Sequence, residues 1–256
     1  MISIIEKHGL FTVKRVWFKK EIDTKCTLLR LMRIGEPINS ETAYNELSYT
    51  PISDLTLEEN ELLMKVRKTC RNEIRRAEKD NLDIFFFDSA TINNNIEILN
   101  EFEAAYKKFA EDLKNEMVSS AYNRNKITQY LKSNCFFLSE AKRGSLSVYH
   151  AYVYDEDEAV LIYSVSDFRD DSVDRNLAGR ANRYLHFQDM IMFKHRGLKV
   201  YDWGNVSNPE NPNGIDNFKL SFGGDIKKKY NVLVGNNFVG KLFVRFYGKR
   251  KEARKK

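Results

Sequence analysis

Residues 197–224 read GLKVYDWGNVSNPENPNGIDNFKLSFGG, and this stretch decides the fold. The apolar and aromatic run at 199–203 predicts a strand, and the Gly-, Asn- and Pro-rich run at 204–214 predicts a loop. A short helix at 215–222 and a glycine pair follow, and they lead into a strand at 225–234. Strand, loop, helix and strand in this order indicate an α/β protein.

The spacing of apolar residues changes upstream of that stretch. A period of two over residues 135–142, 145–154 and 159–165 predicts three antiparallel strands. The helical period returns over residues 177–195, and Gly197 is typical of a residue that stops a helix. The C-terminal half is therefore expected to combine a sheet with at least one long helix.

The N-terminal half also contains both kinds of element. The runs Phe11–Phe18 and Cys26–Met32 are rich in β-branched and aromatic residues and predict a hairpin. Thr56-Leu-Glu-Glu59 reads as a capping box, which opens a helix predicted to run to Lys79. Further predictions are a strand at 84–87, an amphipathic helix at 96–114, a short helix at 124–131 and either a helix or a strand at 238–247.

Composition limits the class of protein. Of the 256 residues, 42% are hydrophobic, 12% aromatic and 30% charged, which suits one large or two small globular domains. Cys26, Cys70 and Cys135 lie far apart and have no metal-ligand spacing, so we expect reduced thiols, no metal and a cytoplasmic protein. No apolar run approaches the roughly 18–20 residues that span a bilayer. Any contact with a membrane is therefore expected at its surface, on the inner, cytoplasmic face.

The positive charge is concentrated at one end of the chain. The 42 Lys and Arg residues exceed the 36 Asp and Glu residues by 42 − 36 = 6. The last eight residues, Lys249–Lys256, hold six basic residues and one acidic residue, so they carry 6 − 1 = +5 of that charge. This segment predicts a mobile basic tail that could contact tRNA or an anionic membrane.

Three ordered motifs carry a resemblance to a known family. They read Lys194-His-Arg-Gly197, Tyr201-Asp-Trp-Gly-Asn205 and Gly214-Ile-Asp-Asn-Phe-Lys-Leu-Ser-Phe-Gly-Gly224. Together they resemble the FemABX-like branch of the GNAT acyltransferases over about residues 135–235. The resemblance implies an α/β (α+β) fold with a GNAT-like mixed sheet flanked by helices. Because the chain is short for two full lobes, we expect a reduced N-terminal lobe over 1–120, a complete acyltransferase lobe over 121–248 and a tail over 249–256.

The resemblance also implies a site for the acyl donor at the start of the long helix. Small residues there would let a phosphate approach backbone N–H groups and the positive end of the helix dipole. The alternative is an ordinary N-terminal turn before a packed helix. Asn176 replaces the Gln or Arg that acetyl-CoA-binding GNAT proteins usually have, and Asn205 replaces a second glycine. The predicted donor-binding residues are Asn176, Gly179, Arg180, Ala181 and Asn182.

The predicted catalytic residues follow from the same motifs. Lys219, beside the glycine pair, could hold a donor phosphate or the developing oxyanion. Asp202 could accept a proton or orient the amine, or it could only hydrogen-bond the Gly204 turn. Asp167 and Tyr163 lie on or after the predicted central strands and complete the set. No serine or cysteine nucleophile is evident, so we expect direct attack, and His150 is expected to be a satisfied strand histidine.

A basic stripe is the candidate site for the acyl acceptor. Arg67, Arg71 and Arg75 fall four residues apart on the capped helix, in a segment similar to a basic helix of the same family. Guanidinium groups at this spacing could clamp a diphosphate on the acceptor. The alternative is a solvated helix face balanced by Glu73 and Glu78.

Three functions are compatible with these features. The resemblance implies first an N-acyltransferase that moves an acyl group from acyl-CoA to an amine of a sugar or cell-envelope precursor, free or linked to a nucleotide or lipid. The second is an aminoacyltransferase that takes its acyl group from aminoacyl-tRNA. The third is a GNAT fold retained as a binding module, for which Asn176 and Asn205 are the evidence. The acyl group, the acceptor and the oligomeric state stay open.

Overall fold

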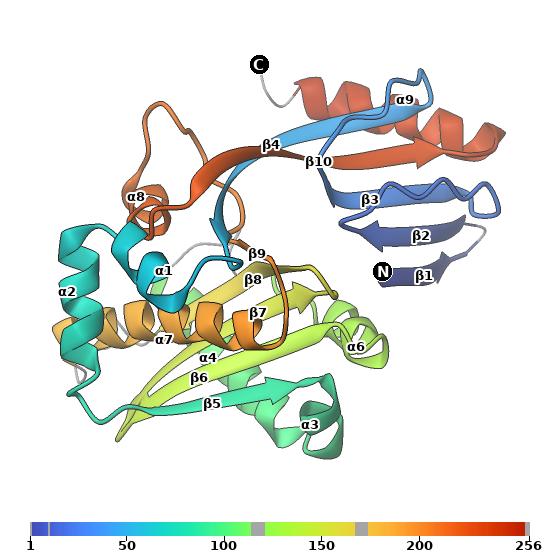
Figure 1. The fold of residues 1–256 in the computed structure, drawn as a ribbon. Coiled ribbons are helices and arrows are strands. Elements are labelled where there is room, and N and C mark those ends of the chain that lie inside the picture. The colour runs from blue at the N-terminus through green and yellow to red at the C-terminus, as the bar shows by residue number, and fades with distance from the viewer. Residues whose placement is uncertain (1, 10, 114–120, 167–173, 254–256) are drawn as a thin grey trace. The chain divides into compact units, whose positions relative to one another are not determined.

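The computed structural model describes residues 2–9, 11–113, 121–166 and 174–253, and the chain divides into two compact units (Figure 1). The first unit is drawn from Met1–Thr50, Asn205–Asn211 and Ile226–Lys256, and the second from Pro51–Gly204 and Pro212–Asp225. The boundary predicted at residue 120 is not a boundary between these units, because residues 51–113 belong to the second one.

The first unit contains one sheet and one helix. Its strands are β1 (Ile2–His8), β2 (Phe11–Trp17), β3 (Leu28–Ile34), β10 (Asp225–Gly235) and the first part of β4 (Ala43–Asp54), in that spatial order. The core is formed by Val16, Leu29, Leu31, Ile34 and Val232, all at most 2% exposed. Leu31 lies opposite both Val16 and Val232, and Leu29 is two residues away, so these four side chains share one face of the sheet.

The hairpin predicted between β2 and β3 is wrong. These two strands pair in parallel, from Val13 opposite Leu28 to Trp17 opposite Met32, and the antiparallel hairpin is β1–β2 instead. The connection 18–27 is long enough for this return, since ten residues reach about 33 Å and a seven-residue strand is about 23 Å long. A long connection between two strand-like runs therefore does not specify a hairpin.

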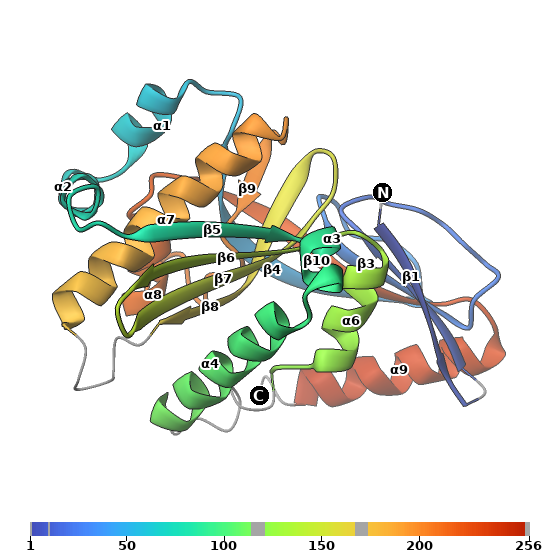
Figure 2. The ribbon, with the colours of Figure 1, turned by 90° about the horizontal axis from the view of Figure 1, so that it is seen from below.

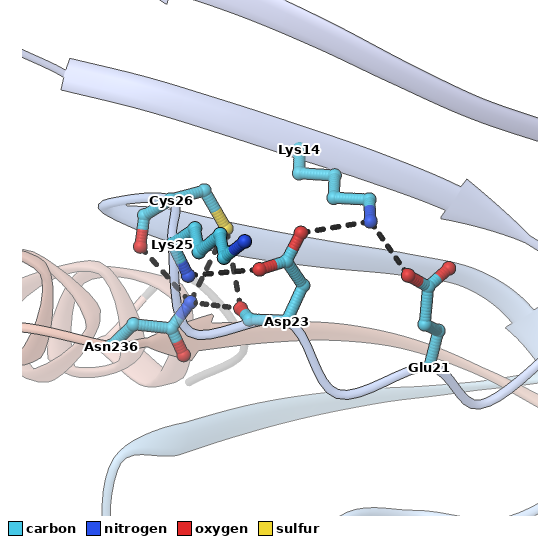
Figure 3. A network of polar contacts seen from close by, with 6 residues as sticks. All are labelled: Lys14, Glu21, Asp23, Lys25, Cys26 and Asn236. Carbon is cyan, nitrogen blue, oxygen red and sulfur yellow. Dashed lines mark hydrogen bonds and ion pairs between the residues drawn. The ribbon is translucent and has the colours of Figure 1, made fainter.

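The connection 18–27 is held by side chains rather than by regular structure. Figure 3 shows Lys14 of β2 reaching down to it, with Nζ 2.6 Å from Glu21 Oε1 and 2.9 Å from Asp23 Oδ2. From the other side, Asn236 Nδ2 donates to the Asp23 and Cys26 carbonyl oxygens at 2.7 and 3.0 Å. These contacts fix the path that brings β3 back beside β2.

The segment predicted as either a helix or a strand is helix α9 (Phe238–Ala253). It includes the first five residues of the segment predicted to be a tail, which are helical, while 254–256 lie outside the described residues. Lys251 Nζ lies 3.1 Å from Glu46 Oε1. In the described part of the chain, no helix is both long and apolar enough to cross a bilayer.

The second unit is built on a mixed sheet. Strands β5 (Asp83–Asp88), β6 (Phe136–Arg143), β7 (Leu146–Tyr154) and β8 (Glu158–Ser166) pair antiparallel with one another in this order, as predicted for the last three. Strand β9 (Val200–Asp202) pairs parallel with β8 and antiparallel with the end of β4. The mixed sheet flanked by helices confirms the predicted fold class.

Helices cover both faces of this sheet (Figure 2). Helix α7 (Arg175–His195) lies on one face, with α2 (Lys68–Ala77) packed against it. On the other face lie α3 (Ser89–Asn94), α4 (Glu97–Leu113) and α6 (Arg124–Lys132). Helix α7 ends as predicted at Gly197, where φ is +87° and the Leu198 and Gly197 N–H groups bond the Phe193 and Lys194 carbonyls.

The helix predicted from Thr56 to Lys79 is two helices, α1 (Glu59–Lys65) and α2. Its capping box is formed by Glu58 and Glu61, while the Thr56 hydroxyl bonds Asp54 Oδ1 at 2.6 Å. The break at residues 66–67 has a tertiary cause, because the Arg67 N–H bonds the Ser221 carbonyl oxygen at 2.8 Å. Ser221 follows α8 (Gly214–Leu220).

Candidate active-site cleft

A cleft of about 490 Å³ opens in the second unit where β8 and β9 stop pairing. Strand β8 pairs with β9 only from Glu158 to Val160, and its remaining residues continue without that neighbour. Helices α4, α7 and α8 supply the other walls. The polar side chains lining the cleft are Ser164, Ser166, Asn182, Arg183, His186 and Lys219.

Two cations lie in the cleft. Lys219 comes from α8, whose start is fixed by a capping box between Asn213 and Asp216. Arg183 comes from α7, where its guanidinium donates to the Gly179 carbonyl oxygen at 2.8 Å and lies 5.2 Å from the centre of the Phe218 ring. The cleft therefore combines positive charge with an apolar wall, which suits a substrate that has an anionic part or develops negative charge.

Gly204 forms the turn that follows strand β9, and this turn lies beside Lys219. Its φ is +74°, a conformation that glycine adopts readily and other residues rarely do. A β-carbon there would lie 3.1 Å from the Leu161 carbonyl oxygen and 3.7 Å from Lys219 Nζ. The glycine of the Tyr-Asp-Trp-Gly motif thus allows a close approach to the Leu161 carbonyl oxygen, beside Lys219.

His186 is the titratable side chain at the buried end of the cleft. It is 1% exposed, and its ring packs against Trp203, Phe218 and Phe222 with centroids 4.8, 5.5 and 5.7 Å away. Burial lowers the pKa of His186 well below its usual value, and the charges of His150, Lys219 and Arg183 lower it further. The imidazole is therefore neutral at neutral pH.

A buried chain of hydrogen bonds begins at His186. Its Nδ1 lies 2.9 Å from the Tyr201 hydroxyl, which lies 2.7 Å from the Tyr152 hydroxyl. The Tyr152 hydroxyl donates to Asp189 Oδ2 at 2.5 Å, and His150 Nδ1 lies 2.7 Å from the same oxygen. Except for His186, all of these residues are 0% exposed.

The direction of these bonds fixes the tautomer of His186. Burial raises the pKa values of Tyr152 and Tyr201 well above the usual value, so each phenol keeps its single proton. Tyr152 gives its proton to the Asp189 carboxylate, so Tyr201 must donate to Tyr152 and His186 Nδ1–H must donate to Tyr201. The lone pair of the neutral ring is therefore on Nε2.

His150 is bonded at both ring nitrogens, because Nε2 lies 2.7 Å from Asn182 Oδ1. The prediction that it is a satisfied strand histidine is confirmed. In the described ranges, His150, His186 and Asp189 also bring three possible metal-ligand atoms within 4.8 Å of one another. The two rings are stacked, 3.7 Å apart and 19° from parallel, so their in-plane lone pairs suit hydrogen bonds better than one shared ion.

The predicted donor-binding residues lie inside α7 rather than in a loop. Asp174 is the N-cap, and its side chain accepts from the Asn176 N–H at 2.8 Å. A carboxylate at this point already satisfies a helix N–H group and would repel a phosphate. A phosphate at the start of this helix would therefore lie close to the Asp174 carboxylate.

The five donor-binding candidates have different surroundings. Gly179 and Asn182 line the cleft with Lys219. Arg180 bonds Asp80 instead, with Nε 2.6 Å from Oδ2, and Ala181 is 0% exposed within the core. The cleft thus brings together the lysine and two of these five residues.

Asp202 and Tyr163 are not among the described residues that line the cleft. Asp202 is 0% exposed and its Oδ1 accepts from the Gly204 N–H at 2.8 Å, which is the structural alternative given above. Tyr163 lies on the α4 face of β8, where its hydroxyl donates to the Ala121 carbonyl oxygen at 3.0 Å and burial raises its pKa to about 12. Asp167 lies outside the described residues.

The arginine stripe also lies apart from the cleft lining. Arg67 is the N-cap of α2, and Arg71 and Arg75 follow along that helix. Arg67 and Arg75 are exposed, while the Arg71 guanidinium donates to the Met64 carbonyl oxygen at 3.1 Å. An acceptor held in the cleft would meet these arginines only if it extended onto α2.

The Gly223-Gly224 pair has a packing role. A β-carbon at Gly223 would lie 2.1 Å from the Lys65 carbonyl oxygen, and one at Gly224 would lie 2.8 Å from the Ile52 carbonyl oxygen. The glycine pair thus approaches α1 through Gly223 and β4 through Gly224, and neither approach leaves room for a side chain. Asn205, the departure from the motif, accepts from Arg33 Nη1 at 2.5 Å within the first unit.

Sequence reasoning missed Arg183, His186 and the two serines. A usable signal was present, because Gly179, Asn182, Arg183 and His186 have the spacing i, i+3, i+4 and i+7 and share one helix face.

The fold of this chain is similar to the fold of FemX and of two related solved structures. FemX has this fold with a TM-score of 0.62 at 10% identity, over 89% of this chain and 83% of that one. The C-terminal domain of a protein described as a lysylphosphatidylglycerol synthetase from Agrobacterium fabrum has a TM-score of 0.59 at 11% identity, covering 95% and 83%. L-PGS from Bacillus licheniformis has a TM-score of 0.51 at 11% identity, covering 99% and 86%.

These likenesses confirm the predicted fold relationship, and at such low identity they concern the fold. No protein-family model and no curated protein matches the sequence.

Proposed function

We propose that this chain is an acyltransferase that transfers an acyl group to an amine bound in the cleft. One observation carries this proposal: the cleft brings Lys219 and Arg183 together with His186, a neutral histidine whose tautomer is fixed. Transfer of an acyl group needs a stabilised oxyanion and a proton acceptor, and these side chains supply both.

The reaction proceeds by direct attack. The amine nitrogen attacks the carbonyl carbon of the acyl donor, and a C–N bond forms as the bond from that carbon to the leaving oxygen or sulfur breaks. His186 Nε2 takes the proton that the amine loses and returns it to the leaving group. The low pKa of His186 favours this return, because the buried imidazolium is a strong acid.

The cations stabilise the negative charge that develops on the carbonyl oxygen. Lys219 is the first candidate, since it is held between Gly204 and the cleft. Arg183 is the second, and its contact with the Phe218 ring keeps the guanidinium against the cleft wall. In a cleft with an apolar wall, such charges act more strongly than they would in water.

Among the two acyl donors that the sequence suggested, we favour aminoacyl-tRNA over acyl-CoA. The specific observation is Asp174 at the N-cap of α7, because its carboxylate is unfavourable beside the diphosphate of CoA. The name of the Agrobacterium fabrum protein, a lysylphosphatidylglycerol synthetase, also denotes a product that carries an aminoacyl group. The leaving group would then be a ribose oxygen.

The acceptor we propose is an amine on a sugar or cell-envelope precursor. Arg67 and Arg75 are exposed on α2, outside the cleft lining. They could therefore bind a diphosphate group carried by that precursor.

A transfer assay with two donors tests the proposal. The purified chain is incubated with a panel of amino sugars and envelope precursors and either bulk tRNA charged with radiolabelled amino acids or labelled acetyl-CoA. We expect an acid-stable amide product with charged tRNA, lost in Lys219→Ala. If only acetyl-CoA gives product, the proposed acyltransferase activity stands and the donor is acyl-CoA instead of aminoacyl-tRNA. No product, with neither salt-sensitive tRNA binding nor stabilisation by acetyl-CoA, would overturn the proposal and favour a binding module.

A further inference from the structure

Helix α9 of the first unit carries a stripe of exposed apolar side chains. The five members are Phe238 (82% exposed), Val239 (51%), Leu242 (45%), Phe243 (42%) and Phe246 (63%). At about 100° per residue, they fall within an arc of about 140° on the helix. A contiguous apolar surface of this kind on one helix indicates an interaction site. We call these five residues the α9 stripe.

Helix α9 cannot rotate to bury this stripe in the core of the first unit, because the opposite side of the helix is held by close contacts. A β-carbon at Gly240 would lie 2.2 Å from the Thr27 carbonyl oxygen, and one at Gly235 of β10 would lie 2.4 Å from the Gly240 carbonyl carbon. A β-carbon at Gly248 would lie 3.0 Å from the Tyr44 ring. Two glycines eight residues apart thus set the rotation of α9 on the sheet.

Positive charge borders the stripe. Lys241, Arg245 and Lys249 are exposed and follow one another at four-residue intervals along one edge of it. Arg250 is also exposed, and Glu252 is the one acidic residue in the described helix. A row of cations beside an aromatic stripe complements an anionic lipid surface, where the rings enter the headgroup region and the cations pair with phosphates.

We propose that α9 is an interfacial helix that docks the protein flat on an anionic lipid bilayer. The geometry fits, since sixteen residues make a helix of about 24 Å that can lie in the plane of the surface. A second copy of the chain fits less well, because two such helices would bring their rows of like charge together. The inference rests on the first unit alone and does not depend on the proposed function.

Vesicle sedimentation of the full chain tests the docking. We expect binding to vesicles of phosphatidylglycerol and phosphatidylcholine in equal parts, at least tenfold weaker binding to phosphatidylcholine alone, and weaker binding at high salt. Leu242→Ser with Phe246→Ser should weaken partition at least tenfold, and Lys241→Gln with Arg245→Gln should weaken it severalfold. Ile96→Ser is the matched control, since it removes an exposed apolar side chain (48% exposed) outside α9.

Circular dichroism and the melting temperature establish that each variant is folded, and the single variant Phe246→Ser replaces the double one if that fails to fold. Three outcomes would overturn the proposal. One is absence of binding to anionic vesicles, and another is equal binding by the stripe variants and the wild type. The third is a wild-type dimer, measured by light scattering, that becomes a monomer in Phe246→Ser. In that case a second copy of the chain, and not a bilayer, covers the α9 stripe.

Discussion

The imidazole rings of His150 and His186 stack with 3.7 Å between their centroids and 19° between their planes. At this distance two imidazolium ions would repel, so a proton on one ring disfavours a proton on the other. His150 is also bonded to Asp189 and Asn182, whereas His186 lines the cleft. Burial first, and this neighbour second, lower the pKa of His186 and keep the cleft histidine neutral.

Removing the cleft lysine should abolish most transfer. In Lys219→Ala we expect kcat to fall about 100- to 1000-fold with little change in melting temperature, because one stabilising group for the oxyanion is lost. Steady-state kinetics measure this, with Lys199→Ala as the control, since Lys199 pairs with Asp157 at the surface. Near-normal turnover in Lys219→Ala would remove the lysine from the mechanism.

The hydrogen-bond chain should control the tautomer of His186. Tyr201→Phe removes the oxygen that accepts from His186 Nδ1–H, so the imidazole loses the preference for a lone pair on Nε2. We expect lower kcat at similar KM, and nitrogen chemical shifts of His186 that move toward a mixture of tautomers.

Stability is also expected to change in that variant, by about 1–3 kcal/mol, because buried polar groups lose a partner. Tyr163→Phe is the matched control, since that hydroxyl bonds the Ala121 carbonyl on the other face of the sheet. Unchanged His186 shifts in Tyr201→Phe would contradict the assigned direction of the bonds.

Stability should fall in mild acid because of His186. Its pKa is lowered in the folded state, whereas in the unfolded chain it is about 6.5. Below that pH the unfolded chain binds a proton that the folded chain does not, so the free energy of unfolding decreases as pH falls, by at most about 1.4 kcal/mol per pH unit. Above it this dependence disappears.

Denaturant titrations between pH 5 and pH 8 measure this slope. His186→Gln should make it shallower, whereas His195→Gln should not, because His195 is a surface residue paired with Glu59. The same slope in His186→Gln as in the wild type would show that another group causes the dependence.

A side chain at residue 204 should damage both the fold and the site. Gly204→Ala would be strained at φ +74° and would crowd the Leu161 carbonyl oxygen, next to Lys219. We expect a loss of about 1–2 kcal/mol in unfolding free energy together with reduced transfer. Gly35→Ala is the control, since a β-carbon there meets nothing within 4 Å. Wild-type stability and turnover in Gly204→Ala would mean that the turn adapts freely.

The arginines on α2 should affect a large substrate and not the chemistry. Replacing Arg67 and Arg75 together with glutamine should raise the KM for tRNA or a diphosphate-linked acceptor severalfold, with kcat retained, because both side chains are exposed and lie outside the cleft lining. A small amino sugar should show no change. An unchanged KM for every substrate would show that the arginines on α2 only form a solvated helix face.

Local patterns predicted most elements but not all of their partners. The strands at 136–143, 146–154 and 158–166 and the helices at 97–113 and 175–195 follow from apolar spacing, which burial on one face imposes. The parallel β2–β3 pair depends on the path of the connection 18–27, and the break before Lys68 depends on Ser221, which is far away in the sequence. Neither cause is local, so neither has a local signal.

The site was predictable to a similar extent. Lys219 follows from a motif, and its neighbour Gly204 from the same resemblance. His186, Arg183 and the chain through Tyr201 and Tyr152 are defined by contacts between elements 15 to 49 residues apart. The glycine pair at 223–224 has a packing role that residue type alone does not distinguish from a phosphate-binding role.

The pairing of β3 with β10 places Leu31 opposite Val232. These residues are 201 positions apart, so during synthesis at about 5–20 residues per second β3 must wait about 10–40 s for its partner. The second unit draws almost all of its residues from the intervening chain. The sheet of the first unit can therefore be completed only after the residues of the second unit have been synthesised.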